Sequence, residues 1–428
     1  MHADESTYDG TWEVFVNVAK QRDWTDEELT WFIELVHGDL ATKERYEGLR
    51  RMRVIEKTAK NRLDFVVFVL GLFHLKMAAA NAYWRIHVEP KSDRDEPVGL
   101  FEYINYLRPK ATAEFAAKNG PGFRSMHETI YHATWTDVLE CWRVEAKKSR
   151  GVDTLEAFAQ SNPTWDDIMS MSTSMVDNCL PPQDFGDERE RDKARRDTVF
   201  ENMRLRNQHG LLYLELARAM NYGDVGRILE LFPYYIAIFT AVGKDKYATH
   251  MIKFYTDLNH VYPPRLREVV LRNWLCNPKG TPDGFRAMDW LQELNNLYTK
   301  VVFAGHGPNR TKNLVFKRSV LLQVYRSLQQ TIEENFYLTR RTVRHSKPKM
   351  TKILQRLQDQ LANVDRFTFH AGRSTSTPAA GRSWIIRDAV NEGFGLLVKK
   401  KTLYNVVDDN TGEAGEAGEI TGEDLGVV

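Results

Sequence analysis

The stretch from Asp197 to His306 constrains the fold most, because apolar side chains recur there at helical spacing between turn residues. Gly223 ends one helical pattern, since glycine accepts the left-handed conformation of a helix C-terminus, and Asp224 is a good N-cap for the next pattern. Pro233 lies inside that next pattern and predicts a kink or a break. Short connections throughout the stretch predict a compact core of packed helices.

Two apolar runs near the N-terminus predict a small parallel α/β unit. The run at 31–36 favours a strand, although Thr25 followed by Glu28 is a capping-box spacing that would also permit a helix there. The run at 63–70 is continuously apolar and indicates a buried strand. A helical pattern follows each run, at 42–57 and at 73–88. The order strand, helix, strand, helix is typical of a parallel unit.

Composition limits the class of protein. The chain has 428 residues, is 42% hydrophobic and has a net charge of +1, so it can bury a large core. Its N-terminus is polar and acidic, unlike a signal peptide, and the most apolar run, 65–73, is about half a membrane span. Cys141, Cys179 and Cys276 lie far apart without a CxxC pair, which indicates a reducing compartment and no structural zinc. We expect an intracellular protein, nuclear or cytoplasmic, without a membrane partner.

Charge is unevenly distributed near the C-terminus. Residues 299–356 are rich in Lys and Arg and contain only Glu333 and Glu334 as acids, whereas residues 402–428 contain acids and no Lys or Arg. Such a stretch predicts binding to the backbone of DNA, and the alternative is a solvated helix face. The residues expected to contact phosphates are Lys312, Lys317, Arg318 and Arg326 on a helix and Arg340, Arg341, Arg344, Lys347 and Lys349 in the turn beyond it.

Three carboxylates are candidates for a metal site. Asp39 follows the first expected strand, and the carboxyl ends of strands are where α/β sheets place ligands such as Mg²⁺. The alternative is that Asp39 caps the next helix. Asp289 and Glu293 are four residues apart, on one face of an expected helix, and the alternative is a solvated face. The chain has no P-loop, GxSxG, HExxH or zinc-finger spacing.

Several long segments carry a family resemblance. The chain resembles a large, uncharacterised family defined by a domain of unknown function and expanded in mushroom-forming fungi. That family in turn resembles transposon-derived proteins with a ribonuclease-H-like catalytic core. The resemblance covers about residues 30–395, and the segments that carry it are HGDLATKER at 37–45, GLFHLKM at 71–77, LLYLELARAMNYGDVGRI at 211–228, a block at 247–280 and DWLQELNNLYTKVVFAGHG at 289–307.

The resemblance implies roles for the same acids. A ribonuclease-H-like core uses one acid on its first strand, one at the end of its fourth strand and one on a late helix after an insertion. Asp39 matches the fourth-strand acid, and Glu293, with Asp289 as the rival, matches the late-helix acid. Asp39 and Glu293 are then expected to lie within about 8 Å of each other and to share a Mg²⁺ ion. Residues 91–284 would be the insertion.

The first acid has no counterpart here, so the resemblance implies a truncated and catalytically inactive copy. An active copy would transfer phosphoryl groups on nucleic acid with Mg²⁺, and that chemistry needs carboxylates around both ions. The other hypothesis is a non-enzymatic helical scaffold for protein interaction.

The expected fold is mainly α with a small, incomplete parallel α/β unit, a ribonuclease-H-like fragment with a large helical insertion and a helical core. The expected divisions are an N-terminal helical lead at 1–30, the partial ribonuclease-H-like unit at 31–90, an irregular helical insertion with a hinge at 91–196, the helical core and basic helices at 197–370, and a linker with a disordered acidic tail at 371–428.

Overall fold

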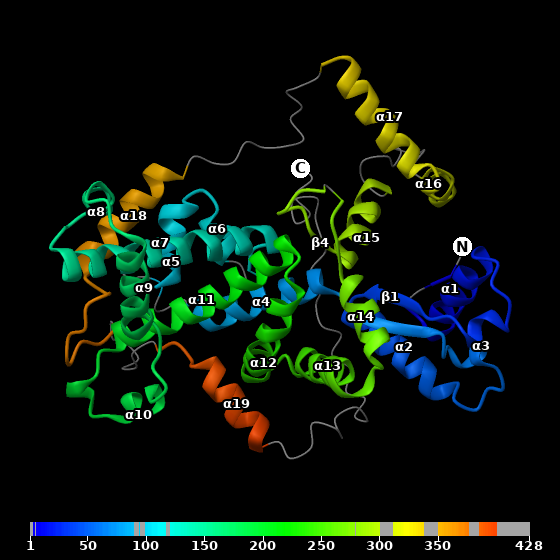
Figure 1. Cartoon of the computed structure of the whole chain (residues 1–428), viewed down its shortest axis with the longest axis horizontal. Helices are drawn as coiled ribbons and strands as arrows, with labels where there is room; N and C mark the ends of the chain where they lie inside the picture. Colours follow the sequence, from blue (N-terminus) through cyan, green and yellow to red (C-terminus); the bar gives the residue numbers. More distant parts are fainter. Residues whose placement is uncertain are drawn as a thin grey trace.

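A computed structural model describes residues 3–4, 6–89, 94, 99–116, 120–278, 280–299, 311–337, 350–375 and 385–399. These residues form a mainly helical molecule with a small parallel sheet near the N-terminus, as the sequence predicts (Figure 1). The N-terminal elements lie at one end, α8–α10 lie at the other, and α4, α11 and α12 lie between them. No helix among the described residues is long and apolar enough to cross a bilayer.

The N-terminal part of the chain contains the parallel sheet and the helices around it. They are α1 (Tyr8–Gln21), β1 (Glu34–Gly38), α2 (Leu40–Met52), α3 (Ala59–Arg62), β2 (Val66–Leu70) and α4 (Leu72–His87). β1 and β2 pair in parallel, with Glu34 opposite Val66 and Gly38 opposite Leu70. The strand-helix-strand-helix order predicted from the sequence is therefore confirmed. β1 begins three residues later than the apolar run does, and Trp31 is exposed before it.

A group of helices follows the sheet. They are α5 (Leu100–Leu107), α6 (Thr112–Ala116), α7 (Phe123–Arg150), α8 (Leu155–Gln160), α9 (Trp165–Cys179) and α10 (Phe185–Glu190). α7 is one uninterrupted helix of 28 residues and packs against α4, α9 and α11. This part of the chain is more regular than its sequence pattern indicates.

The predicted core helices are α11 (Thr198–Tyr222), α12 (Val225–Ala241), α13 (Asp245–Thr256) and α14 (Pro264–Arg272). Gly223 ends α11 in the left-handed conformation, and the Asp224 side chain accepts a hydrogen bond from Arg227 N at 2.9 Å, so both predicted boundaries are confirmed. α12 continues through Pro233 without a break. Phe232 directly before Pro233 and Tyr235 two residues after it are buried, and such packing outweighs one missing backbone hydrogen bond.

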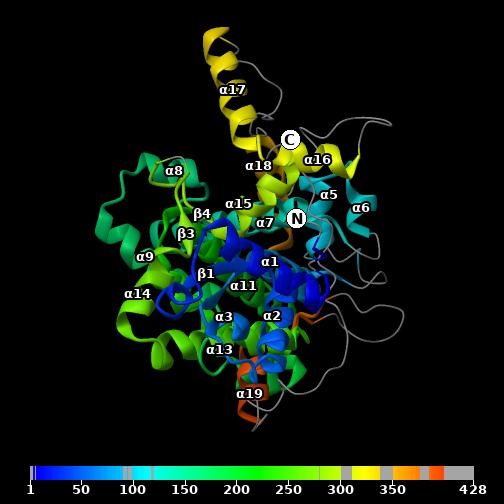
Figure 2. The same ribbon diagram turned by 90° about the vertical axis from the view of Figure 1, so that its right-hand side faces the viewer.

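The remaining elements are β3 (Leu275–Cys276), β4 (Arg286–Ala287), α15 (Met288–Leu297), α16 (Lys312–Ser319), α17 (Leu322–Asn335), α18 (Thr351–Val364) and α19 (Ala389–Lys399). α15 returns to pack on α4 and β1, whereas α17 points away from the rest of the molecule in both views (Figures 1 and 2).

The last helices close the core. α18 packs on α5 and α7, and α19 packs on α12. Just after α18, the fully buried Arg366 places its guanidinium 2.6 Å from the Asp137 carboxylate, which also lies 3.2 Å from the Arg206 guanidinium. Burial raises the pKa of Asp137 to about 6 although Arg206 acts to lower it. This ionic centre ties the segment after α18 to α7 and α11.

Candidate functional site

The two parallel strands end side by side, and this end of the sheet is where the candidate acids lie. Gly71 N donates a hydrogen bond to Gly38 O at 3.2 Å, so the residues after β1 and β2 stay in contact. Asp39 comes next and accepts a hydrogen bond from Thr42 N at 2.7 Å through Oδ1. One oxygen of Asp39 therefore caps α2, which is the structural role that the sequence left open.

Asp289 reaches the same place from α15. Its Oδ1 accepts a hydrogen bond from Phe73 N at 3.1 Å, and its Oδ2 accepts one from His74 N at 3.0 Å and lies 3.0 Å from His74 Nδ1. These amides are the free donors at the start of α4, whose own N-cap position is Gly71 and offers no side-chain cap. Asp289 thus caps α4 from a distant part of the chain, and it is 3% exposed.

Gly71 is required for this approach. A Cβ at residue 71 would lie 2.4 Å from Asp289 Oδ2 and 2.7 Å from Gly38 O, and both distances are far inside van der Waals contact. Any larger side chain would therefore push α15 away from the strand ends. The glycine lets the carboxylate of α15 reach the backbone between β2 and α4.

His74 joins the two acids of α15. Its Nδ1 contacts Asp289, and its Nε2 lies 4.0 Å from Glu293 Oε1, one helical turn further along α15. Burial acts to lower the pKa of His74, but the hydrogen bond to Asp289 and the charges of Asp289, Asp39 and Glu293 together raise it above 6.5. The His74 ring is therefore biased toward the imidazolium form, which neutralises part of the acidic charge.

We call Asp39, His74, Asp289 and Glu293 the strand-end cluster. The structure brings all three predicted acids into the electrostatic surroundings of one histidine. Burial lowers the pKa of His37, at the end of β1, against the opposing charge of Asp289. Burial also lowers the pKa of Lys76 to about 8. The neutral form of His37 is therefore favoured near neutral pH, whereas Lys76 keeps most of its charge there and is a second cation near Asp289.

The hydrogen bonds that each acid already accepts determine which carboxylate oxygens remain available to a ligand. Both oxygens of Asp289 already accept hydrogen bonds from buried groups. Glu293 is the more accessible acid of α15, with 24% of its side chain exposed, and its Oε2 lies 3.5 Å from Asn296 Nδ2. Within the described part of the chain, no set of three or more His, Cys, Asp or Glu side chains is arranged to hold a metal ion.

The predicted phosphate-contacting residues divide into two groups. Lys312 begins α16, Lys317 and Arg318 lie in the last turn of α16, and Arg326 lies on α17. The Arg326 guanidinium lies 4.7 Å from the centre of the Tyr298 ring. The other residues lie outside the described residues; they are Arg340, Arg341, Arg344, Lys347 and Lys349.

Comparison with known proteins gives one match. The model of a family of unknown function (DUF6589) matches residues 1–345. The chain belongs to this family. No curated protein and no solved structure matches it. The resemblance to an uncharacterised family is thus confirmed at that level, and the DUF6589 match contains the whole strand-end cluster together with α16 and α17, whereas α18 and α19 follow it.

His74 is the member of the cluster that sequence reasoning missed. A signal for it exists, because GLFHLKM places a histidine in the first turn of a helix that directly follows a buried strand. Such a position faces the same strand ends as Asp39. The pairing of His74 with Asp289 could not be read from the sequence, since more than two hundred residues separate them.

Proposed function

We propose that this DUF6589 protein is a transposase-derived, ribonuclease-H-like protein that binds nucleic acid without cleaving it. The observation that carries the proposal is the return of α15 to the carboxyl ends of β1 and β2. A ribonuclease-H-like core places one acid after its fourth strand and one on a late helix. The positions of Asp39 after β1 and of Asp289 and Glu293 on α15, all near His74, support this assignment.

The order of elements supports the same proposal. A strand, a crossover helix, a second parallel strand and a helix are followed by helices α5–α14, and only then by the helix with the late acids. A helical insertion at this place in the chain is what the resemblance implies. The contact between α15 and the sheet matters more than the order alone, because it brings the late acids to the strand ends.

The hydrogen bonds of the cluster support an inactive site. Two-metal phosphoryl transfer needs carboxylate oxygens that are free to bind ions. Asp289 gives both oxygens to the start of α4, Asp39 gives one to α2, and His74 already supplies positive charge between the acids of α15. The residues therefore fit a Mg²⁺ site poorly.

That Asp39 and Glu293 share a divalent ion stays a prediction. Manganese offers a direct measurement, because binding of Mn²⁺ to the full chain can be titrated by electron paramagnetic resonance. An ion shared by the two acids would require a site whose affinity falls at least about tenfold in Asp39→Asn and in Glu293→Gln. Equal affinity in the wild type and both variants would remove these residues as ligands.

The arm formed by α16 and α17 supports binding to nucleic acid. Lys317 is exposed, and Lys317 and Arg318 lie together at the end of α16, just before α17, which points away from the rest of the molecule (Figure 2). Cations on a projecting helix can approach a phosphate backbone without a matching groove. Such contacts give affinity that depends on salt and not on base sequence.

Fluorescence anisotropy with labelled duplex DNA tests this proposal. We expect binding at about 50 mM salt that weakens steeply by about 200 mM, with equal affinity for two unrelated sequences. The double variant Lys317→Glu/Arg318→Glu should bind much more weakly. Lys147→Glu/Lys148→Glu is the matched control, because it makes the same charge change at two exposed lysines on α7. No binding at the lower salt concentration, or equal loss in both double variants, would contradict a role of the arm.

A second candidate function, a scaffold for protein interaction, is favoured by one feature of the same arm. Val324, Leu328 and Ile332 of α17 recur at every fourth residue and are 51%, 54% and 49% exposed, and Val320 and Phe336 continue this spacing just beyond its ends, at 81% and 72% exposed. Residues four apart share a helix face, so α17 presents an apolar ridge. If the ridge mediates self-association, sedimentation of the full chain should show oligomers that Leu328→Glu removes and Gln323→Glu, on an exposed polar position, retains.

A further inference from the structure

Two of the three cysteines meet in the fold although they are far apart in the sequence. Cys141 lies in the middle of α7 and is buried, whereas Cys179 is the last residue of α9 and is half-buried. The two thiols are hydrogen-bonded to each other. Asn207 of α11 fixes the pair, because its Nδ2 lies 3.5 Å from Cys141 Sγ and donates to Cys179 O at 3.0 Å.

The surroundings give the two sulfur atoms different reactivity. The hydrogen bond from Cys141 and the charge of Arg204 lower the pKa of Cys179 against the opposing effect of burial. Arg204 is held beside it, since its Nε donates to Asn178 O at 3.0 Å. Burial raises the pKa of Cys141 well above its ordinary value. Cys179 is also the more accessible of the two sulfur atoms, so the geometry favours Cys179 as the attacking thiol and the buried Cys141 as the resolving thiol.

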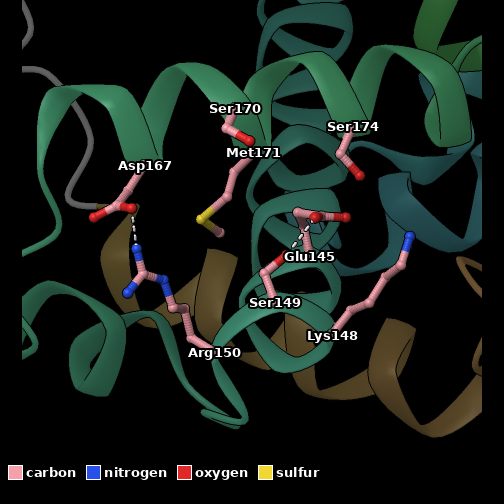
Figure 3. Close-up of a pocket in the computed structure, with 8 residues that line it drawn as sticks. All are labelled: Glu145, Lys148, Ser149, Arg150, Asp167, Ser170, Met171 and Ser174. Carbon is pink, nitrogen blue, oxygen red and sulfur yellow. Dashed lines mark hydrogen bonds and ion pairs between the residues drawn. The ribbon is translucent and has the colours of Figure 1, made fainter.

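A hollow lies between α7 and α9, the two helices that carry the pair. Its volume is about 280 Å³, and Figure 3 shows Glu145 and Ser149 of α7 facing Ser170, Met171 and Ser174 of α9 across it. Glu145 lies one helical turn after Cys141, and its charge acts on Cys179. Neither cysteine lines this hollow, so a small oxidant would meet the pair at the half-buried Cys179, at the end of α9.

We propose that Cys141 and Cys179 form a hydroperoxide-responsive thiol pair that closes into a disulfide between α7 and the end of α9. The Cys179 thiolate attacks one oxygen of the hydroperoxide, the O–O bond breaks, and the leaving hydroxide or alkoxide takes up a proton. Cys141 sulfur then attacks the Cys179 sulfenic acid, the S–S bond forms, and hydroxide leaves with the Cys141 proton as water. Two thiols are oxidised by two electrons, and the hydroperoxide is reduced.

Hydrogen peroxide added to the full chain tests the proposal. The wild type has three cysteines, so it should lose two titratable thiols and about 2 Da in intact mass, and dithiothreitol should restore both. Peptide mapping should find the peptides of Cys141 and Cys179 joined. Cys276→Ser is the matched control, because Cys276 is half-buried on β3, away from the pair, and this variant should form the same disulfide.

The single variants separate the roles of the two sulfur atoms. Cys179→Ser should react at least about tenfold more slowly with peroxide than Cys276→Ser, because the activated thiolate is gone. Cys141→Ser should react at Cys179 but stop at the sulfenic acid, which a dimedone probe detects. Circular dichroism of each variant shows whether it is folded. If the buried Cys141→Ser variant does not fold, the reaction rate of Cys179→Ser still tests the proposal. The proposal is overturned if Cys276 oxidises first, or if Cys179 oxidises beyond the sulfenic acid while Cys141 stays free in the wild type.

Discussion

Replacing Asp289 by alanine should destabilise the fold strongly, because this carboxylate joins α15 to the start of α4. The substitution removes the acceptor of Phe73 N, His74 N and His74 Nδ1 at once. The remaining donors are buried, and water cannot replace the lost acceptor without opening the contact between α15 and α4. The change therefore tests whether the long-range cap is a main support of the strand-end cluster.

The expected magnitude follows from these bonds. A buried donor left without a partner costs about 1–3 kcal/mol, and loss of an N-cap costs about 0.5–2 kcal/mol. These effects overlap, so we expect Asp289→Ala to lower the free energy of unfolding by about 3–5 kcal/mol, as for a broken buried ion pair. Asp289→Asn keeps one acceptor oxygen for His74 and turns an amide group toward Phe73 N, so about half of that loss is expected.

Urea denaturation followed by tryptophan fluorescence measures the effect. Asp283→Ala is the control, because it removes the same charge from an exposed position near α15 and should change stability by less than about 0.5 kcal/mol. The reasoning is refuted if Asp289→Ala stays within about 1 kcal/mol of the wild type, or if the control is equally destabilised.

Three further predictions concern His74, the ion pairs of Asp137 and the acidic C-terminal residues. The pKa of His74 in the folded protein is raised above 6.5, so its contribution to stability is complete below about pH 6.5 and is lost as pH rises through the folded value. The difference in unfolding free energy between wild type and His74→Gln should therefore shrink from about pH 6 to pH 8. A constant or growing difference would contradict the raised pKa. Arg366→Ala leaves the buried Asp137 with one guanidinium fewer, so urea denaturation should show that the free energy of unfolding falls by about 3–5 kcal/mol. A fall of less than about 1 kcal/mol would contradict this role of Arg366. Deletion of residues 408–428 removes acids that compete for the basic arm, so DNA affinity in the anisotropy assay should rise, and unchanged affinity would exclude that competition.

Local sequence signals predicted a helix or strand well where residues a few positions apart determine its boundaries or its burial. The cap pair Gly223 and Asp224 and the apolar run of β2 are such signals, because backbone conformation and burial act within a few residues. Pro233 shows the limit, since the helix continues through it where Phe232 and Tyr235 pack into the core. Local preference decides an element only where packing does not oppose it.

The candidate site could be predicted only in part, because its contacts are made between distant segments. Asp39 was recognisable as an acid after a strand, and Asp289 and Glu293 as two acids on one helix face. Neither the cap of α4 by Asp289 nor the position of His74 between the acids follows from spacing. The same holds for Cys141 and Cys179, whose separation in the sequence hides a direct contact.

One titration tests the central claim, that the chain binds nucleic acid through its arm while the acids of the strand-end cluster do not cleave it. End-labelled duplex DNA is incubated with the full chain and Mn²⁺ at about 50 mM salt, and bound fraction and strand length are read from the same samples. The account predicts near-complete binding with the DNA intact in the wild type and in Asp39→Asn. Cleavage by the wild type that Asp39→Asn or Glu293→Gln abolishes would contradict it, and so would intact DNA that never binds.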